Sequence, residues 1–409
     1  MPALPLSGIK ILDLTRILAG PLSAQMLGDL GAEVIKIERP GTGDDARAFG
    51  PPYLQDPEGR ENNNNSFYLC ANRNKKSVTV NIAKPEGQEI IRALAKDVDV
   101  FMENYKVGDL KRYGLGYDEI RKINPGIIYC SVTGFGQTGP YAARAGYDAI
   151  FQAMGGLMSV TGHMDGEPGA GPMKVGPSIV DYMTGMNTSI GILSALYHRK
   201  VNGGAGQHID ISLLDTVIAS LSHYLQIYLV SGKTPPRRGT WGNGGMPAGV
   251  FRCSDGELML VVGNDAQFAR TCAVLGAPEL ATIPKFIKNN DRVVNGKEIM
   301  AIFASHFLKN TVAHWLEGLE EAGVPCGPVN DFAHVFADPH VQERGMRVKV
   351  NHKFEPELSL IRNALTFSGT PVTEYRAPPL LGENTQEVLS TMLGFDAERI
   401  EGLKKQGVI

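Results

Sequence analysis

A single carboxylate, Asp181, stands near the start of an apolar stretch that covers residues 174–200. The pattern predicts a helix that begins near Pro177 or Ser178, so Asp181 falls in its first turn. There the helix dipole and the unpaired backbone N–H groups favour an ionised carboxylate. A carboxylate that is partly desolvated beside backbone donors can attack an acyl carbon as a nucleophile. An acidic first turn is equally typical of an ordinary helix start, so this stretch alone leaves both interpretations open.

Cationic and amide side chains stand next to several predicted strands. Residues 72–76 (NRNKK), here called the basic group, precede a strand predicted at residues 77–82. Asn104 ends another strand, and Arg112 lies in a short helix beyond it. Such residues suit a phosphate-bearing ligand on an α/β sheet. They would also make an ordinary solvated charged face.

Alternating apolar segments must position these side chains. Strands are predicted at residues 9–14, 33–38, 98–102 and 127–132, with helices at residues 21–30, 85–96 and 117–123. A strand, a helix and a second strand within about 30 residues form a βαβ unit, which requires a parallel sheet with a right-handed crossover. We therefore predict an α/β fold with a large Rossmann-like domain.

The composition changes in the second half of the chain. A long apolar helix is predicted at residues 213–230, and residues 231–249 are rich in glycine, proline and arginine, which is typical of a linker with a functional loop. The predicted division has four parts. They are residues 1–212 as the first part of the large domain, 213–249 as helix, linker and glycine loop, 250–332 as a small α+β domain, and 333–409 as a return to the large domain.

Two stretches imitate nucleotide-binding motifs. The first strand is followed by TRILAGP rather than GxGxxG, and GTGDDA at residues 41–46 is not followed by an apolar helix. Both observations argue against an NAD or FAD site. SGKT at residues 231–234 resembles the end of a P-loop, but Ile227 replaces the earlier glycine and two prolines block a helix.

The overall composition is that of an ordinary globular protein. The 409 residues are 43% hydrophobic and 20% charged, with a net charge of −3, so nothing points to nucleic acid or to an acidic membrane surface. No apolar run approaches the length of a membrane span and no presequence is recognisable. The five cysteines are scattered without a CxxC pair, and the histidines show no ligand spacing. We expect a cytoplasmic protein with no metal site, and the absence of GxSxG and HExxH argues against a hydrolase.

In combination, several motifs resemble the class III coenzyme A (CoA) transferases, the family of formyl-CoA transferase and carnitine-CoA transferase. The similarity runs from Ile9 to about Gly407. Its motifs are ILDLTRILAGPLSAQMLGDLGAEVIKIERPGTGD, NRNKKSVTVNI, MENYKVGDLKRYGL, GFGQTGPYAARAGYD, VGPSIVDYMTGM and GNGGMPAGVF. Residues 286–299 and the pattern RAPPLLGENT are closer to the dicarboxylate branch, of the succinyl-CoA:glutarate type.

The resemblance implies a CoA-transferase with a Rossmann-like large domain, a smaller domain and two protomers interlocked as rings in a homodimer. It implies Asp181 as the nucleophile, Tyr147 and Asp148 facing the acyl group, and Gly244 with Gly245 in a mobile loop over them. The residues implied to contact the nucleotide of CoA are Arg39, Arg73, Asn74, Lys75, Lys76, Asn104 and Arg112. CoA thioesters would be substrates, with no tightly bound cofactor.

The implied reaction needs no histidine base, because carboxylates are anionic at neutral pH and the thiol leaves as a thiolate. Acyl-CoA racemases of the same superfamily carry histidine where this chain has Tyr147, and a tyrosine is a poor base at neutral pH. A CoA-binding protein without activity is a third alternative. If one of Arg16, Arg47 and Arg144 faces the acyl group, it would pair in a bidentate manner with a second carboxylate of the substrate and so favour a dicarboxylate.

Overall fold

The parallel sheet expected from the sequence is present in the computed structural model, which describes residues 3–56, 58–59, 61–242 and 244–409. Six parallel strands lie in the order β5-β2-β1-β6-β7-β8. Their bounds are β1 Lys10–Asp13, β2 Glu33–Glu38, β5 Lys75–Thr79, β6 Val100–Glu103, β7 Ile128–Thr133 and β8 Gln207–Ser212. The order reverses between β1 and β6, and α/β sheets bind ligands at such a point, outside the carboxyl ends of the strands.

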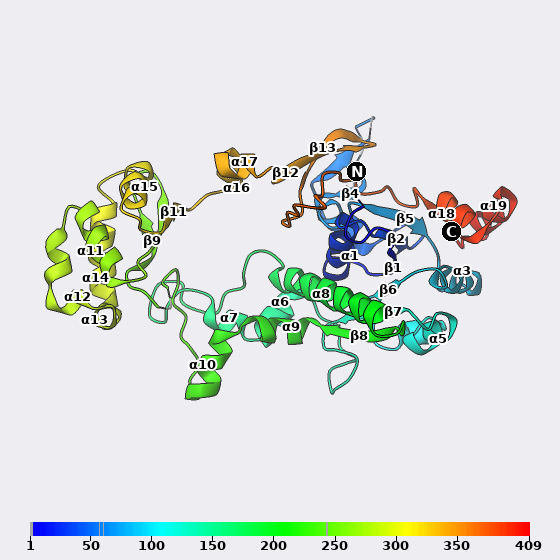
Figure 1. Cartoon of the computed structure of the whole chain (residues 1–409), viewed down its shortest axis with the longest axis horizontal. Helices are drawn as coiled ribbons and strands as arrows, with labels where there is room; N and C mark the ends of the chain where they lie inside the picture. The colour runs from blue at the N-terminus through cyan, green and yellow to red at the C-terminus, as the bar shows by residue number, and fades with distance from the viewer. Residues whose placement is uncertain (1–2, 57, 60, 243) are drawn as a thin grey trace. The chain divides into compact units, whose positions relative to one another are not determined.

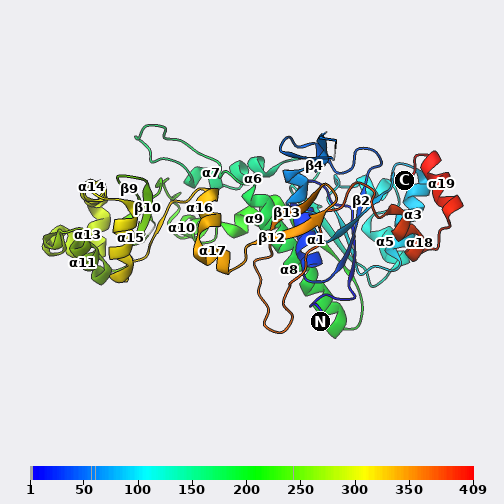
Figure 2. The ribbon, with the colours of Figure 1, turned by 90° about the horizontal axis from the view of Figure 1, so that it is seen from above.

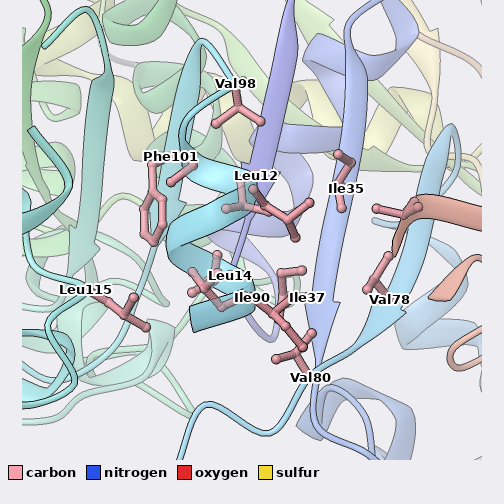
Figure 3. Packing of buried hydrophobic residues seen from close by; sticks show 14 of the residues in the cluster. Leu12, Leu14, Ile35, Ile37, Val78, Val80, Ile90, Val98, Phe101 and Leu115 are labelled. Carbon is pink, nitrogen blue, oxygen red and sulfur yellow. The ribbon is translucent and has the colours of Figure 1, made fainter. Parts of the chain in front are cut away.

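Helices cover both faces of this sheet (Figure 1 and Figure 2). One face packs on α3 Pro85–Ala95, α5 Tyr117–Ile123, α18 Thr385–Leu393 and α19 Ala397–Lys405; the other packs on α1 Ala19–Asp29, α6 Asp148–Met154, α8 Ile179–Val201 and α9 Leu213–Ser220. Successive strand residues alternate between the two cores: Leu12 joins the first, as Figure 3 shows, and Ile11 joins the second. The sheet is therefore buried on both faces, as parallel sheets require.

The described residues group into two compact units. The larger comprises Met1–Leu157, Lys174–Thr234 and Arg344–Ile409, and the smaller comprises Met158–Met173 and Pro235–Glu343. The smaller unit has its own core around the antiparallel strands β9 Ala248–Arg252, β10 Glu257–Val261 and β11 Cys326–Pro328. Its helices are η2 Pro278–Thr282, α11 Asp265–Val274, α12 Pro284–Ile287, α13 Asn289–Val294, α14 Gly296–Phe307, α15 Val312–Glu321, α16 Phe332–Ala337 and α17 Pro339–Glu343.

Short elements complete the chain. They are η1 Asp45–Ala48, β3 Tyr53–Gln55, β4 Glu61–Asn65, α2 Ser66–Leu69, α4 Asp109–Arg112, α7 Leu157–Val160, α10 His223–Ser231, and the hairpin β12 Arg347–His352 with β13 Glu355–Ile361. The single helix predicted at residues 213–230 is wrong, because α9 and α10 are separated by a bend of 76°. Ser222 lies at the bend with φ of 44°, a value that does not continue a helix. In the described part of the chain no single helix is long and apolar enough to cross a membrane, and this bent pair passes only by length and composition.

Candidate active site

Asp181 lies in the first turn of α8, which begins at Ile179 as the sequence predicts. The Ser178 side chain does not cap this helix. Instead, Oδ1 of Asp148 accepts hydrogen bonds from the backbone N–H groups of Val180 at 2.7 Å and Asp181 at 3.2 Å. A helix start attracts anions through its unpaired N–H groups. The carboxylate of α6 thus occupies the first amides of the helix that carries Asp181.

The two carboxylates set the acidity of Asp181. Burial, and secondly the nearby negative charge of Asp148, together raise the pKa of Asp181 to about 7. A carboxylate with this pKa is more basic, and therefore more nucleophilic, than an exposed one, and about half of it is ionised at pH 7. Tyr147, predicted beside Asp148 at the acyl group, is 66% exposed at the start of α6.

A cavity of about 290 Å³ opens at the carboxyl ends of strands on both sides of the point where the sheet order reverses. It is lined by Arg16, Ile37, Glu38, Arg39, Gly43, Asp44, Val80, Asn81, Ile82, Ala83, Tyr105, Asp109 and Tyr113. Arg39 is exposed at the end of β2 and has no ion-pair partner among the described residues, so its guanidinium is available to a ligand. Arg112 is exposed nearby and pairs with Asp109 at 2.6 Å.

The turn after β1 is held in a strained shape beside this cavity. Ile17 has φ of 73°, which is costly for a β-branched residue. Its N–H donates to Asp44 at 2.9 Å, and the Asn104 amide donates to the Arg16 carbonyl at 2.7 Å while accepting from the Arg16 N–H at 2.9 Å. The buried Lys36 ammonium pairs with Asp44 at 2.8 Å and holds the pKa of that carboxyl below its usual value, against the opposing effect of burial. Asn104, predicted as a CoA contact, therefore positions Arg16.

The backbone of the basic group lies before β5 and at its first residues, whereas the cavity lies beyond the last residues of that strand. Arg73 pairs with Asp29 at 2.6 Å and the buried Lys75 ammonium lies 3.2 Å from Asp13, so neither charge is available to a ligand in this structure. The Asn74 amide donates to Asp29 at 2.7 Å, and Lys76 forms ion pairs of 2.8 Å with two glutamates. Because β5 begins at Lys75, the structure does not bring these four predicted residues to the cavity.

Residues that follow β5 were missed by the sequence reasoning. Val80, Asn81, Ile82 and Ala83 line the cavity. The signal was present, because ligands of parallel sheets bind beyond the carboxyl ends of the strands rather than before them. Of the three arginines considered for a second carboxylate, Arg47 is buried and pairs with Glu38 at 2.7 Å, whereas Arg16 reaches the cavity. The Arg144 guanidinium stacks 3.8 Å from the Tyr141 ring centroid.

Gly244 and Gly245 belong to the smaller unit, just before β9. A Cβ on Gly245 would come within 2.0 Å of the Val262 carbonyl oxygen, so only glycine fits there. The Gly244 carbonyl accepts a hydrogen bond from Asn289 at 2.9 Å. Within the described ranges, no cluster of three or more histidine, cysteine, aspartate or glutamate side chains could hold a metal ion.

Comparison with known proteins establishes the class. Residues 6–385 match the family described as CoA-transferase family III. The chain is 43% identical over 405 residues to human succinyl-CoA:glutarate CoA-transferase, covering 99% of this chain and 90% of the relative. It is 42% identical over 388 residues to succinate–glutarate CoA-transferase of Agrobacterium fabrum, covering 95% and 96%. A crystal structure of a CaiB/BaiF family protein from Brucella suis superposes with a TM-score of 0.86 at 39% identity. The match covers 95% of this chain and 100% of that protein's chain.

The chain belongs to CoA-transferase family III. It is an enzyme that transfers CoA, and CoA thioesters are its substrates. The resemblance stated from the motifs is confirmed.

Proposed function

We propose that the enzyme moves CoA from succinyl-CoA to a dicarboxylic acid such as glutarate, with Asp181 as the nucleophile. The observation that carries the proposal is the partly buried Asp181 carboxylate at the start of α8, beside Asp148 and with its pKa raised to about 7. The names of the two relatives described above support the donor and the acceptor.

The reaction proceeds through two covalent states of Asp181. The carboxylate attacks the thioester carbonyl and expels the CoA thiolate, which leaves a mixed anhydride. The thiolate then attacks the aspartyl carbonyl, which releases the donor acid and forms an aspartyl-CoA thioester. The acceptor carboxylate attacks this thioester to form a second anhydride and free thiolate. Finally the thiolate attacks the acyl carbon of the acceptor, which gives the new acyl-CoA and restores Asp181.

The nucleotide end of CoA binds in the 290 Å³ cavity, where Arg39 contacts phosphate and Asn104 holds the turn that presents Arg16. Oxyanions form at each attack and need N–H donors. Asp148 already occupies the amides of Val180 and Asp181. The donors for these oxyanions must therefore come from N–H groups other than those two.

The enzyme works as a homodimer with interlocked protomers in the cytoplasm. Met186, Ile190, Tyr197 and Val201 of α8 are 43%, 61%, 69% and 57% exposed. Their helical spacing places them on one stripe, which a second copy of the chain covers. Light scattering coupled to size exclusion tests this state; a monomer at micromolar concentration would refute it. The five cysteines are all unpaired, which supports a reducing compartment.

The test of the function is CoA exchange followed by mass spectrometry. Succinyl-CoA is offered with glutarate, oxalate, formate, mesaconate or citramalate to the wild type and to Asp181→Ala. Asp215→Ala is the matched control, because Asp215 also lies in the first turn of a helix, α9. We expect glutaryl-CoA from the wild type and the control but none from Asp181→Ala. Equal product from all three would remove Asp181 from the mechanism, and product with another acid alone would replace glutarate as acceptor.

A further inference from the structure

Gln152 of α6 is fully buried. It forms hydrogen bonds with Asp148 and with the segment that precedes α8, the helix that carries Asp181. Its Nε2 donates to Oδ2 of Asp148 at 2.6 Å, and its Oε1 accepts from the Val175 N–H at 2.8 Å. A carboxylate only accepts and a backbone N–H only donates, so these partners fix the orientation of the amide. Gln152 thereby ties the carboxylate that covers α8 to the segment that leads into α8.

The network continues directly to the nucleophile. Oδ2 of Asp148 is held by Gln152, and Oδ1 of Asp148 receives the N–H groups of Val180 and Asp181. Without the amide, Asp148 would keep only the α8 contacts and could rotate away from them. The hydrogen bonds of the Gln152 side chain go to Asp148, Val175 and Pro177 and not to the Asp181 side chain, so its influence on Asp181 passes through Asp148.

We propose that Gln152 is a positioning residue that holds the Asp148 carboxylate against the start of α8 and thereby sets the pH range in which Asp181 acts as nucleophile. The proposal rests on the proposed function of Asp181. Part of the raised pKa of Asp181 comes from the charge of Asp148, which supports this coupling. A merely structural role for Gln152 would change stability and leave the pH dependence of the reaction where it is.

Two substitutions of Gln152 should move the pKa of Asp181, and with it the acid limb of kcat/KM, in opposite directions. Gln152→Leu releases Asp148, so its repulsion of Asp181 weakens and the acid limb of kcat/KM moves to lower pH by about half to one unit. Gln152→Glu keeps the size of the side chain and adds a negative charge beside Asp148, so the acid limb moves to higher pH. Loss of a hydrogen bond to a charged group lowers kcat about ten- to a hundredfold. KM for the acyl-CoA donor stays within about twofold, because Gln152 does not line the cavity proposed to bind the nucleotide of CoA.

The experiment measures kcat/KM for CoA exchange from pH 5 to 9 in both variants, with Gln25→Leu as the matched control. Gln25 is a buried glutamine that also joins two segments, through the Cys70 carbonyl at 3.0 Å and the Arg73 N–H at 3.0 Å. The control is expected to lose stability without any shift of the acid limb. Asp148→Asn and the double variant Asp148→Asn/Gln152→Leu complete a cycle that tests whether Gln152 acts through Asp148.

The expected result is a shift of opposite sign in the two Gln152 variants, and the shift of Gln152→Leu disappears in the Asp148→Asn background. An unshifted acid limb in both Gln152 variants, or a full shift in the Asp148→Asn background, would overturn the proposal. Gln152→Glu preserves volume and decides the question if Gln152→Leu fails to fold. Asp181→Ala is assayed in parallel: if it remains active, the proposed nucleophile has failed, whereas an inactive Asp181→Ala with unshifted Gln152 variants refutes only the role of Gln152.

Discussion

Replacing Asp181 by asparagine should stabilise the protein above neutral pH while abolishing transfer. The pKa of this carboxyl is raised from 3.8 to about 7 in the folded protein, first by burial and then by Asp148. The folded state therefore holds the proton more tightly than the unfolded chain does. As pH rises from about 4 to 7 the unfolded chain loses the proton first, so the wild type loses stability across this window. Asparagine has no proton to lose and escapes the penalty.

The magnitude follows from the shift. Each pKa unit is worth about 1.36 kcal/mol, so a rise from 3.8 to about 7 corresponds to about 4 kcal/mol when fully expressed. At pH 5 part of the penalty is already present. Linkage then predicts that the advantage of Asp181→Asn over the wild type grows by about 2.5 kcal/mol between pH 5 and pH 8. A gain of this size is a large part of the stability of a typical domain.

Urea unfolding at pH 5, 6, 7 and 8 measures the difference. The control is Asp215→Asn, an exposed first-turn residue of α9, which should show no pH-dependent gain. A difference between Asp181→Asn and wild type that stays constant across these pH values would refute the reasoning. It would mean that the fold does not disfavour the ionised form of Asp181.

Three further outcomes can be measured. Glu103→Gln should also gain stability above pH 7 in urea unfolding, because burial raises the Glu103 pKa to about 7, while kcat/KM stays within about threefold. Arg47→Met should lose about 3–5 kcal/mol in the same assay, since it leaves the buried Glu38 carboxylate without its cation; a loss below 1 kcal/mol would contradict this. Gly185→Val should lose at least about 1–3 kcal/mol in thermal unfolding, because a Cβ would meet the Ala19 carbonyl oxygen at 2.9 Å.

The fold could be predicted because its signals are local. Apolar strands such as residues 33–38 and 127–132 recur as β2 and β7 with boundaries that differ by a residue or less. The parallel sheet followed from the strand–helix–strand spacing. The break between α9 and α10 could not be read from composition, because both halves are apolar and only the backbone at Ser222 separates them.

The site could be predicted only in part, because a sequence pattern reports local structure and not tertiary contacts. The type and position of Asp181 at a helix start predict its proposed role, whereas Asp148 was predicted only from the family resemblance. The sequence could not show that the basic group does not line this cavity, because charge says nothing about which end of a strand a residue occupies. Arg73 and Lys75 have their charges matched by Asp29 and Asp13, which stand more than forty and sixty positions away in sequence. Such internal pairing depends on tertiary contacts that no local pattern contains.

The arrangement at α8 supports the proposed role of Asp181 as the nucleophile. An ordinary first-turn aspartate is stabilised by the free amides of its own helix and becomes a weak base. Here Asp148 takes the amides of Val180 and Asp181, so Asp181 gains burial and a neighbouring negative charge but no compensating donor. The raised pKa of Asp181 lowers the stability of the folded protein near neutral pH and makes this carboxylate more basic than an exposed one. In the proposed mechanism both intermediates attach an acyl group or CoA to Asp181 and remove its charge, so forming either one relieves the repulsion from Asp148.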